Sequence, residues 1–200
     1  ERIGRRSFYR LTADGAERFA DATRRIYAGP APAWNGRLTL VVLPAGGTRE
    51  GLRRELSWAG FGMLGPGTLF HPAPDREALA HVLAHAPAGA APLVLDSGIE
   101  GGGQSLSTLA AEAWPLQEVA ARYGVFRRLF EPLAETRPRL DPARALSLRL
   151  LLIHEYRKAG LRDPHLPAAF LPGDWSGFAA KGLAAKLYRI PIGDPSGLDR

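Results

Sequence analysis

The chain has 200 residues, enough for one good-sized domain or two to three small ones, and its lack of cysteine excludes disulfides, thiolate zinc sites and cysteine nucleophiles. Hydrophobic residues at 46% and charged residues at 23% are typical of globular proteins and argue against wholesale disorder. The net charge of +6 favours an anionic partner such as nucleic acid or a phosphorylated ligand, although an arginine-rich solvated surface explains it equally well.

The sequence contains no apolar run of membrane-spanning length and does not open with the pattern of a secretory signal peptide. We therefore expect a cytoplasmic protein that does not enter a membrane. The first residue is Glu1 rather than methionine, which suggests a processed or trimmed chain or a part of a longer protein.

The amino-terminal segment predicts a strand followed by a helix. Residues 4–6 are a turn signal, and residues 7–11 include the aromatic and apolar members of a strand. Thr12 is a candidate N-cap for a helix that continues to about Tyr27. The glycine and prolines of residues 29–32 end this helix and mark the first domain boundary. The stripe of this helix comprises Ala16, Phe19, Thr23 and Ile26.

Residues 34–97 predict a strand-helix-strand-strand-helix-strand order, which is that of a ferredoxin-like α+β unit. An apolar run predicts the first strand, Gly60 ends the first helix, and Asp75 is the N-cap of the second helix. The predicted strands are 38–43, a hairpin over 61–70, and 92–96; the predicted helices are 49–58 and 75–86.

From Leu106 onward the pattern is helical, which predicts a second, all-helical domain. We expect helices over 106–123, 125–135, 142–160 and 176–188. Residues 143–159 are apolar almost all round, so this segment is predicted to form the buried central helix. The fold class is therefore α+β.

The sequence contains no phosphate-binding P-loop, no nucleophile elbow and no zinc-protease motif, and we expect no enzymatic activity, cofactor or metal. Two weaker patterns remain open. The glycines Gly98, Gly101 and Gly103 can cradle a phosphate or form a joint between domains. His81 and His85 are spaced to offer two imidazoles to one metal, but without a carboxylate at a suggestive spacing a solvated helix face is expected.

Two stretches have a specific pattern: Gly4-Arg5-Arg6-Ser7-Phe8-Tyr9-Arg10-Leu11-Thr12-x-x-Gly15 and Arg157-x(5)-Asp163-Pro164-x-Leu166-Pro167-x-x-x-Leu171-Pro172-x-Asp174-Trp175-x-Gly177. The first resembles the wing strand of the winged-helix domain of the PaaX-type repressors, the regulators of phenylacetate-degradation operons. The second resembles the signature of that family's carboxyl-terminal domain. Between them, Trp34-Asn35-Gly36, Arg53-x-x-Leu56 and Gly60-Phe61-Gly62 resemble the family's Cas2-like ferredoxin domain.

The resemblance implies the end of a winged-helix domain over residues 1–28, a Cas2-like domain over 34–100 and a helical carboxyl-terminal domain over 105–200. It implies a transcriptional repressor of an aromatic-acid catabolic operon that binds double-stranded operator DNA as a homodimer. An aryl-acetyl-CoA effector such as phenylacetyl-CoA would release the DNA. The residues of the wing that would contact DNA are Arg5, Arg6, Ser7 and Tyr9.

An acyl-CoA effector needs cationic groups for its phosphates and an apolar slot for its acyl end. The candidate effector-binding residues are Arg149, His154, Arg157, Lys158 and Trp175. Arg157 can instead pair with Asp163 or Asp174 and hold the loop of the signature. The signature residues expected to be structural are Asp163, Pro164, Leu166, Pro167, Leu171, Pro172, Trp175 and Gly177.

The sequence departs from the family pattern at its start, because the helix-turn-helix that precedes the wing is absent. The wing alone would make few phosphate contacts with DNA. Cas2-type nucleases also use an aspartate at the end of the first strand, where this chain has Leu43 and Pro44. The alternatives to a repressor are a CoA-thioester-binding module and a Cas2-like metal-dependent nuclease, each without regulatory DNA binding.

Overall fold

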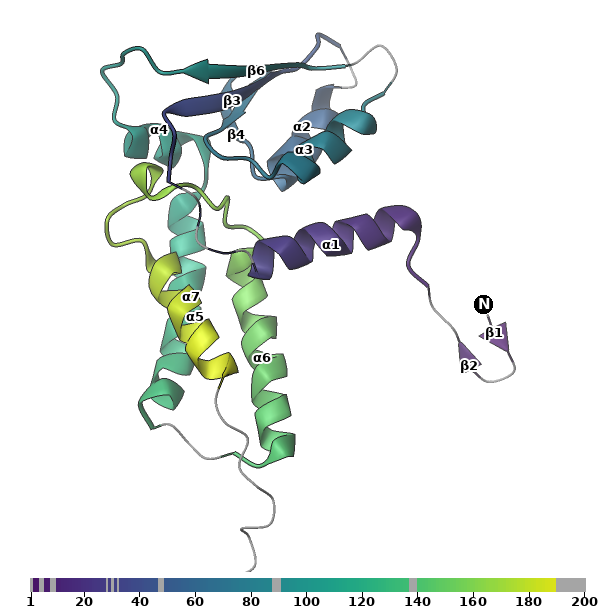
Figure 1. The fold of residues 1–200 in the computed structure, drawn as a ribbon, viewed down its shortest axis with the longest axis vertical. Coiled ribbons are helices and arrows are strands. Elements are labelled where there is room, and N and C mark those ends of the chain that lie inside the picture. The colour runs from purple at the N-terminus through teal and green to yellow at the C-terminus, as the bar shows by residue number, and fades with distance from the viewer. Residues whose placement is uncertain are drawn as a thin grey trace, which may run out of the picture.

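The computed structural model describes residues 2–3, 6–7, 10–27, 29, 31, 33–46, 49–87, 91–136 and 140–189, without the side chains of residues 2, 3, 6, 7, 13 and 14. Figure 1 shows an α/β unit, a bundle of long helices beneath it, and helix α1 (Ala13–Tyr27), which extends sideways from between the two. Beyond α1 lies a small antiparallel hairpin of β1 (Arg2–Ile3) and β2 (Arg6–Ser7).

Helix α1 begins and ends where the sequence predicts. Thr12 caps it, because its side-chain oxygen accepts a hydrogen bond of 3.1 Å from the backbone N–H of Gly15. The strand predicted up to Leu11 is wrong at its end, since Arg10 and Leu11 lie in no strand and Leu11 is exposed. Phe19, on the predicted apolar stripe, is 66% exposed, so this stripe is not buried along its whole length.

The α/β unit has the predicted order of elements. Its four strands form one antiparallel sheet with the spatial order β4-β5-β3-β6, so both helices serve as crossovers between strands. The elements are β3 (Arg37–Val42), α2 (Arg49–Trp58), β4 (Gly62–Gly65), β5 (Thr68–His71), α3 (Arg76–Ala84) and β6 (Leu93–Gly98).

Helices α2 and α3 cover one face of the sheet and enclose a small apolar core. Val41 and Leu69 point from the strands into this core, where they meet Leu56 and Leu79 from the helices. The chain leaves α2 at Gly60, whose φ of +97° is a conformation that favours glycine at the end of a helix. The predicted N-cap of α3 is confirmed, because Asp75 accepts hydrogen bonds from two backbone N–H groups in its first turn.

The second half of the chain is helical, but the predicted first break is wrong. The break is predicted at Gly124, but Gly124 lies inside the long second helix. The first helix ends ahead of Trp114 and Pro115, because helical geometry is disfavoured at the residue before a proline. The elements are α4 (Leu106–Ala113), α5 (Leu116–Thr136), α6 (Pro142–Gly160), a short 3-10 turn η1 (Ala168–Phe170) and α7 (Ser176–Tyr188). Within the described residues, no helix is long and apolar enough to cross a membrane.

The central helix of the bundle is α5 rather than α6. Tyr123, Phe126 and Phe130 of α5 are almost fully buried in the larger of the two apolar cores. In α6, by contrast, Leu146 and Leu150 are exposed at 58% and 65%, because the helix buries only one of its faces. The prediction of a buried central helix over 143–159 is therefore wrong.

Trp114 joins the helical part to the open face of the sheet. Its ring lies 4.8 Å from that of Phe70, centroid to centroid, and its Nε1–H donates a hydrogen bond of 2.8 Å to the carbonyl of Gly60. A Cβ atom at position 62 would lie only 2.5 Å from the ring, so glycine at this position is what allows the close approach.

We expect Gly62→Ala to destabilise the protein by about 1–3 kcal/mol, because the added methyl forces Trp114 out of its packed position. Urea denaturation followed by circular dichroism measures this difference. Gly65→Ala, in the same strand but with open space around its Cβ, is the matched control. Equal losses in the two variants would contradict the proposed role of the close contact.

Candidate functional site

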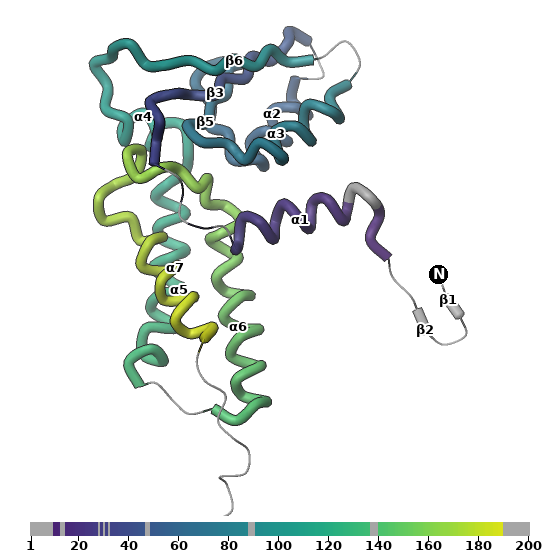
Figure 2. Tube along the Cα trace, viewed as in Figure 1, coloured from purple at the N-terminus to yellow at the C-terminus, as the bar shows by residue number. Residues whose placement is uncertain are grey.

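A cleft of about 850 Å³ lies where the three parts of the molecule meet. Its walls come from α1, from Trp58 at the end of α2, from residues 71–76 up to the start of α3, and from Pro164 and His165. Figure 2 shows the loop after α6 passing beneath the α/β unit near the carboxyl end of α1. Clefts of this volume at the junction of domains are common places for small ligands to bind.

Arg25, in the last turn of α1, connects all three parts. Its guanidinium donates hydrogen bonds to the backbone carbonyl of Trp58 and, at 2.9 Å, to that of Asp163, and it lies 5.8 Å from the centre of the Trp58 ring. Burial lowers the pKa of Arg25 from its usual value. The hydrogen-bond acceptors are neutral carbonyls, so they orient the guanidinium without neutralising its charge.

His71, at the end of β5, holds the loop after α6 against the sheet. Its Nδ1 accepts a hydrogen bond of 3.0 Å from the backbone N–H of Ala73, so the ring proton is on Nε2, which donates to the carbonyl of Pro164 at 2.9 Å. Burial lowers the pKa of His71 to about 4. The ring is therefore neutral at physiological pH; Nδ1 holds the local turn at Ala73, and Nε2 joins β5 to the loop after α6.

The buried Asp163 holds the loop after α6 through its carboxylate. Its carboxylate accepts hydrogen bonds of 2.8 Å from the hydroxyl of Tyr123 and 2.8 Å from the backbone N–H of His165. Burial, followed by the nearby charge of Asp163, raises the pKa of Tyr123, which keeps the hydroxyl protonated as a donor.

His165 has an unusual backbone and an unsatisfied side chain. Its φ is +55°, which is uncommon for a residue other than glycine, and its buried Nε2 has no hydrogen-bond partner in the described part of the chain. Burial lowers the pKa of this imidazole. The ring lines both this cleft and a smaller cavity of about 400 Å³ beside α5, α6 and α7.

The cleft contains many charges, and most of them are paired. Arg24 contacts Asp75 at 3.2 Å and Glu77 at 3.1 Å, and Arg37 contacts Asp96 at 2.8 Å. Two further arginines are near carboxylates: Arg18 is 3.5 Å from Glu55, and Arg76 is 3.9 Å from Asp96. An anionic ligand can therefore bind these arginines by taking the place of a carboxylate.

The predicted effector-binding residues lie elsewhere. Arg149 donates a hydrogen bond of 3.1 Å to the carbonyl of Tyr188, between α6 and α7, and Lys158 pairs with Glu155 at 2.6 Å. His154 and Arg157 are exposed on α6, and neither lines the two cavities described here. Among the five, Trp175 alone lines one of these two cavities, the smaller one.

The signature residues are mostly buried. Leu166, Leu171 and Trp175 pack in the larger core, whereas Pro172 is exposed. The contacts suggested between Arg157 and Asp163 or Asp174 are not among the ion pairs of the described residues. The signature loop is instead contacted by Arg25 and His71, from outside the helical domain.

The predicted wing residues cannot be located in the same way. Arg5 and Tyr9 lie outside the described residues, and Arg6 and Ser7 are placed in β2 by their backbone alone. Of the predicted phosphate-binding glycines, Gly98 is the last residue of β6, and Gly101 and Gly103 lie between β6 and α4; none of the three lines either cavity.

Two comparisons of sequence relate the chain to known proteins. Residues 114–192 match the model of the PaaX-like protein C-terminal domain. Over 205 aligned residues the chain is 36% identical to the transcriptional repressor PaaX of Escherichia coli K12, and the match covers 94% of this chain. It spans only 62% of the length of that relative.

A solved structure has a similar fold. The uncharacterized protein Rv0674 from Mycobacterium tuberculosis superposes with a TM-score of 0.55 over 90% of this chain and 70% of its own. At 22% sequence identity, this likeness concerns the fold alone.

We expect the stability of the protein to fall below about pH 6.5, because the unfolded chain gains a proton on His71 that the native state excludes until about pH 4. Going from pH 7 to pH 5 then costs about 2 kcal/mol through this residue. Urea denaturation at the two pH values measures the change.

His71→Gln, which retains a donor for the Pro164 carbonyl, should remove the part of the pH dependence that His71 contributes and leave the part due to the buried His165. His154→Gln, at an exposed position on α6, is the matched control and should leave it intact. An unchanged pH dependence in His71→Gln would assign the effect to other groups.

Proposed function

We propose that this chain, which belongs to the PaaX-like family, acts in a transcriptional repressor of an aromatic-acid catabolic operon of the phenylacetate type. The observation that supports this best is its 36% identity with a transcriptional repressor, which extends over both the α/β unit and the helical part. In this proposal an aryl-acetyl-CoA such as phenylacetyl-CoA releases the operator DNA.

The proposed DNA contacts are made by a winged-helix domain whose wing includes Arg5, Arg6, Ser7 and Tyr9. Helix α1 then connects that domain to the rest of the molecule. The α/β unit is, in this view, a Cas2-like domain with a structural role, including the formation of a homodimer. Nuclease activity is not proposed, since β3 ends at Val42 and the residues that follow it, Leu43 and Pro44, offer no carboxylate.

We place the effector in the cleft of about 850 Å³ between α1, the α/β unit and the loop after α6, rather than on α6. The cleft supplies five arginines for the phosphates, and Trp58 and Tyr27 offer aromatic surface for the acyl end. The sequence-based candidates Arg157 and Lys158 are on the exposed side of a helix, without a neighbouring cavity for an aryl group among the two described. The proposed effector site therefore includes Arg24, Arg25 and Arg76 instead of the residues on α6.

This location gives the effector a means to act on DNA binding. Arg24 is on α1, and its partners Asp75 and Glu77 are at the start of α3. A phosphate that binds Arg24 weakens these contacts and changes how α1 is held against the α/β unit. A coupling free energy of about 3 kcal/mol between effector and DNA would give a response of about 150-fold.

Isothermal titration of the chain with phenylacetyl-CoA tests the effector assignment, with free phenylacetate and free CoA as controls. We expect micromolar binding of the thioester, and weaker or no binding of its two halves. Arg76→Ala should weaken binding by about tenfold, the effect of losing one charge-assisted contact to a phosphate. Arg76 is suited to this test because its contact with Asp96 is long, at 3.9 Å.

Arg157→Ala is the matched control and should bind the thioester as the unchanged protein does. The opposite result, with Arg157→Ala impaired and Arg76→Ala unaffected, would move the site to α6. If none of the three compounds binds, the assignment of an aryl-acetyl-CoA effector to this chain is wrong.

A further inference from the structure

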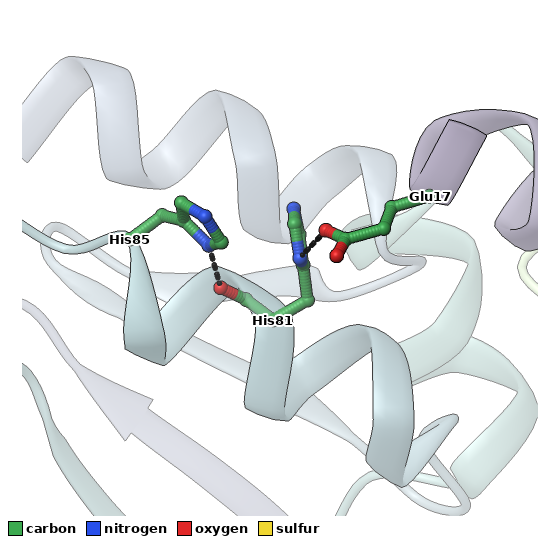
Figure 3. A group of neighbouring side chains, drawn as sticks. All are labelled: Glu17, His81 and His85. Carbon is green, nitrogen blue, oxygen red and sulfur yellow. Dashed lines mark hydrogen bonds and ion pairs between the residues drawn. The ribbon is translucent and has the colours of Figure 1, made fainter. Parts of the chain in front are cut away.

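Three metal-ligating side chains from two helices converge at the outer end of the cleft. Glu17 is in the second turn of α1, and His81 and His85 are in the last turn and at the C-cap of α3 (Figure 3). One potential ligand atom from each residue lies within 4.8 Å of the other two. The sequence places the two histidines together but gives no sign of Glu17, which is brought there by the fold.

The two histidines are arranged to offer nitrogens to one ion. Residues four apart lie on the same face of a helix, and the two ring centroids are 4.2 Å apart. Nδ1 of His85 is 2.9 Å from the carbonyl of His81, and because a carbonyl only accepts, this Nδ1 carries the proton of the neutral ring. The lone pair of His85 is then on Nε2, and a backbone carbonyl that fixes the other nitrogen is typical of metal-ligating histidines.

Glu17 supplies the carboxylate. Its Oε2 lies 2.7 Å from Nδ1 of His81, an ion pair if His81 is protonated. A divalent ion can take the place of that proton between the same two groups. Ligand atoms around a tetrahedral zinc are about 3.3 Å apart at normal bond lengths, so small side-chain rotations suffice to close the present separation of up to 4.8 Å.

We propose that Glu17, His81 and His85 bind a divalent transition-metal ion of the zinc class. Two imidazoles with one carboxylate suit Zn²⁺, Co²⁺ or Ni²⁺ better than the oxygen-preferring Mg²⁺ or Ca²⁺. The side chains of His81 and Glu17 are 24% and 55% exposed, so an ion can enter from solvent and water can complete its coordination. The chain has no cysteine that could compete for the ion.

The ion would bridge α1 and α3. Arg24 already ties the second half of α1 to the start of α3, through Asp75 and Glu77. Glu17 lies nearer the amino-terminal end of α1, in the half that is otherwise exposed. The metal would therefore fix α1 to α3 at a second point. This inference does not depend on the proposed effector.

Isothermal titration of the tag-free chain with ZnCl₂ tests the site, and Co²⁺ absorption provides a spectroscopic measure of coordination by nitrogen and oxygen. We expect one ion per chain. His85→Ala and Glu17→Gln should each weaken binding by at least about tenfold, as is usual for the loss of a group that matters to a metal site. His154→Ala, which removes an exposed histidine from α6, should bind as the unchanged protein does.

Two results would overturn the proposal. The first is the absence of Zn²⁺ binding in the micromolar range, which would leave only the ion pair of Glu17 with His81 on a solvated surface. The second is equal binding by the unchanged protein and by either His85→Ala or Glu17→Gln. Circular dichroism of each variant tests whether it is folded, and Glu17→Gln, which changes only an exposed carboxylate, is expected to retain the fold.

Discussion

The arrangement of the molecule depends on the contact between Trp114 and a sheet strand that has no side chain at position 62. A tryptophan buries a large apolar area, and its indole N–H must find an acceptor when buried. Here the acceptor is the carbonyl of Gly60, the residue at which the chain leaves α2. One side chain thus joins the helical part to the α/β unit through both packing and a directed hydrogen bond.

Around this contact, the junction is held by side chains that bond to backbone carbonyls. His71 donates to Pro164 and Arg25 to Trp58 and Asp163. Carbonyl acceptors are present whatever the side chain, so these contacts tie segments distant in sequence without a matching acidic residue. They also leave the arginine charge at the edge of the cleft uncompensated by direct pairing, whereas the more exposed arginines around it are engaged with carboxylates.

Local features could be predicted from the sequence, and features that need distant segments could not. Features that depend on a few neighbouring residues were predicted: the caps at Thr12 and Asp75, the end of α2 at Gly60 and the hairpin over 61–70. Gly124 was a misleading break because the aromatic residues of α5 bury well enough to outweigh its low helix propensity. Arg25 and Glu17 gain their partners only when α1 lies against the α/β unit, and no local spacing in the chain indicates that.

Because α1 is long and is held most firmly at its carboxyl end, a small rotation there moves its amino-terminal end much farther. A helix of 15 residues is about 22 Å long. Its carboxyl end is held at the junction by the hydrogen bonds of Arg25, whereas its amino-terminal half contacts the α/β unit through the exposed side chains of Glu17 and Arg18. A rotation of about 15° at the held end therefore displaces the far end by about 6 Å. Changes of side-chain pairing at the ångström scale inside the cleft are in this way enlarged into displacements of several ångströms at the amino-terminal end of α1.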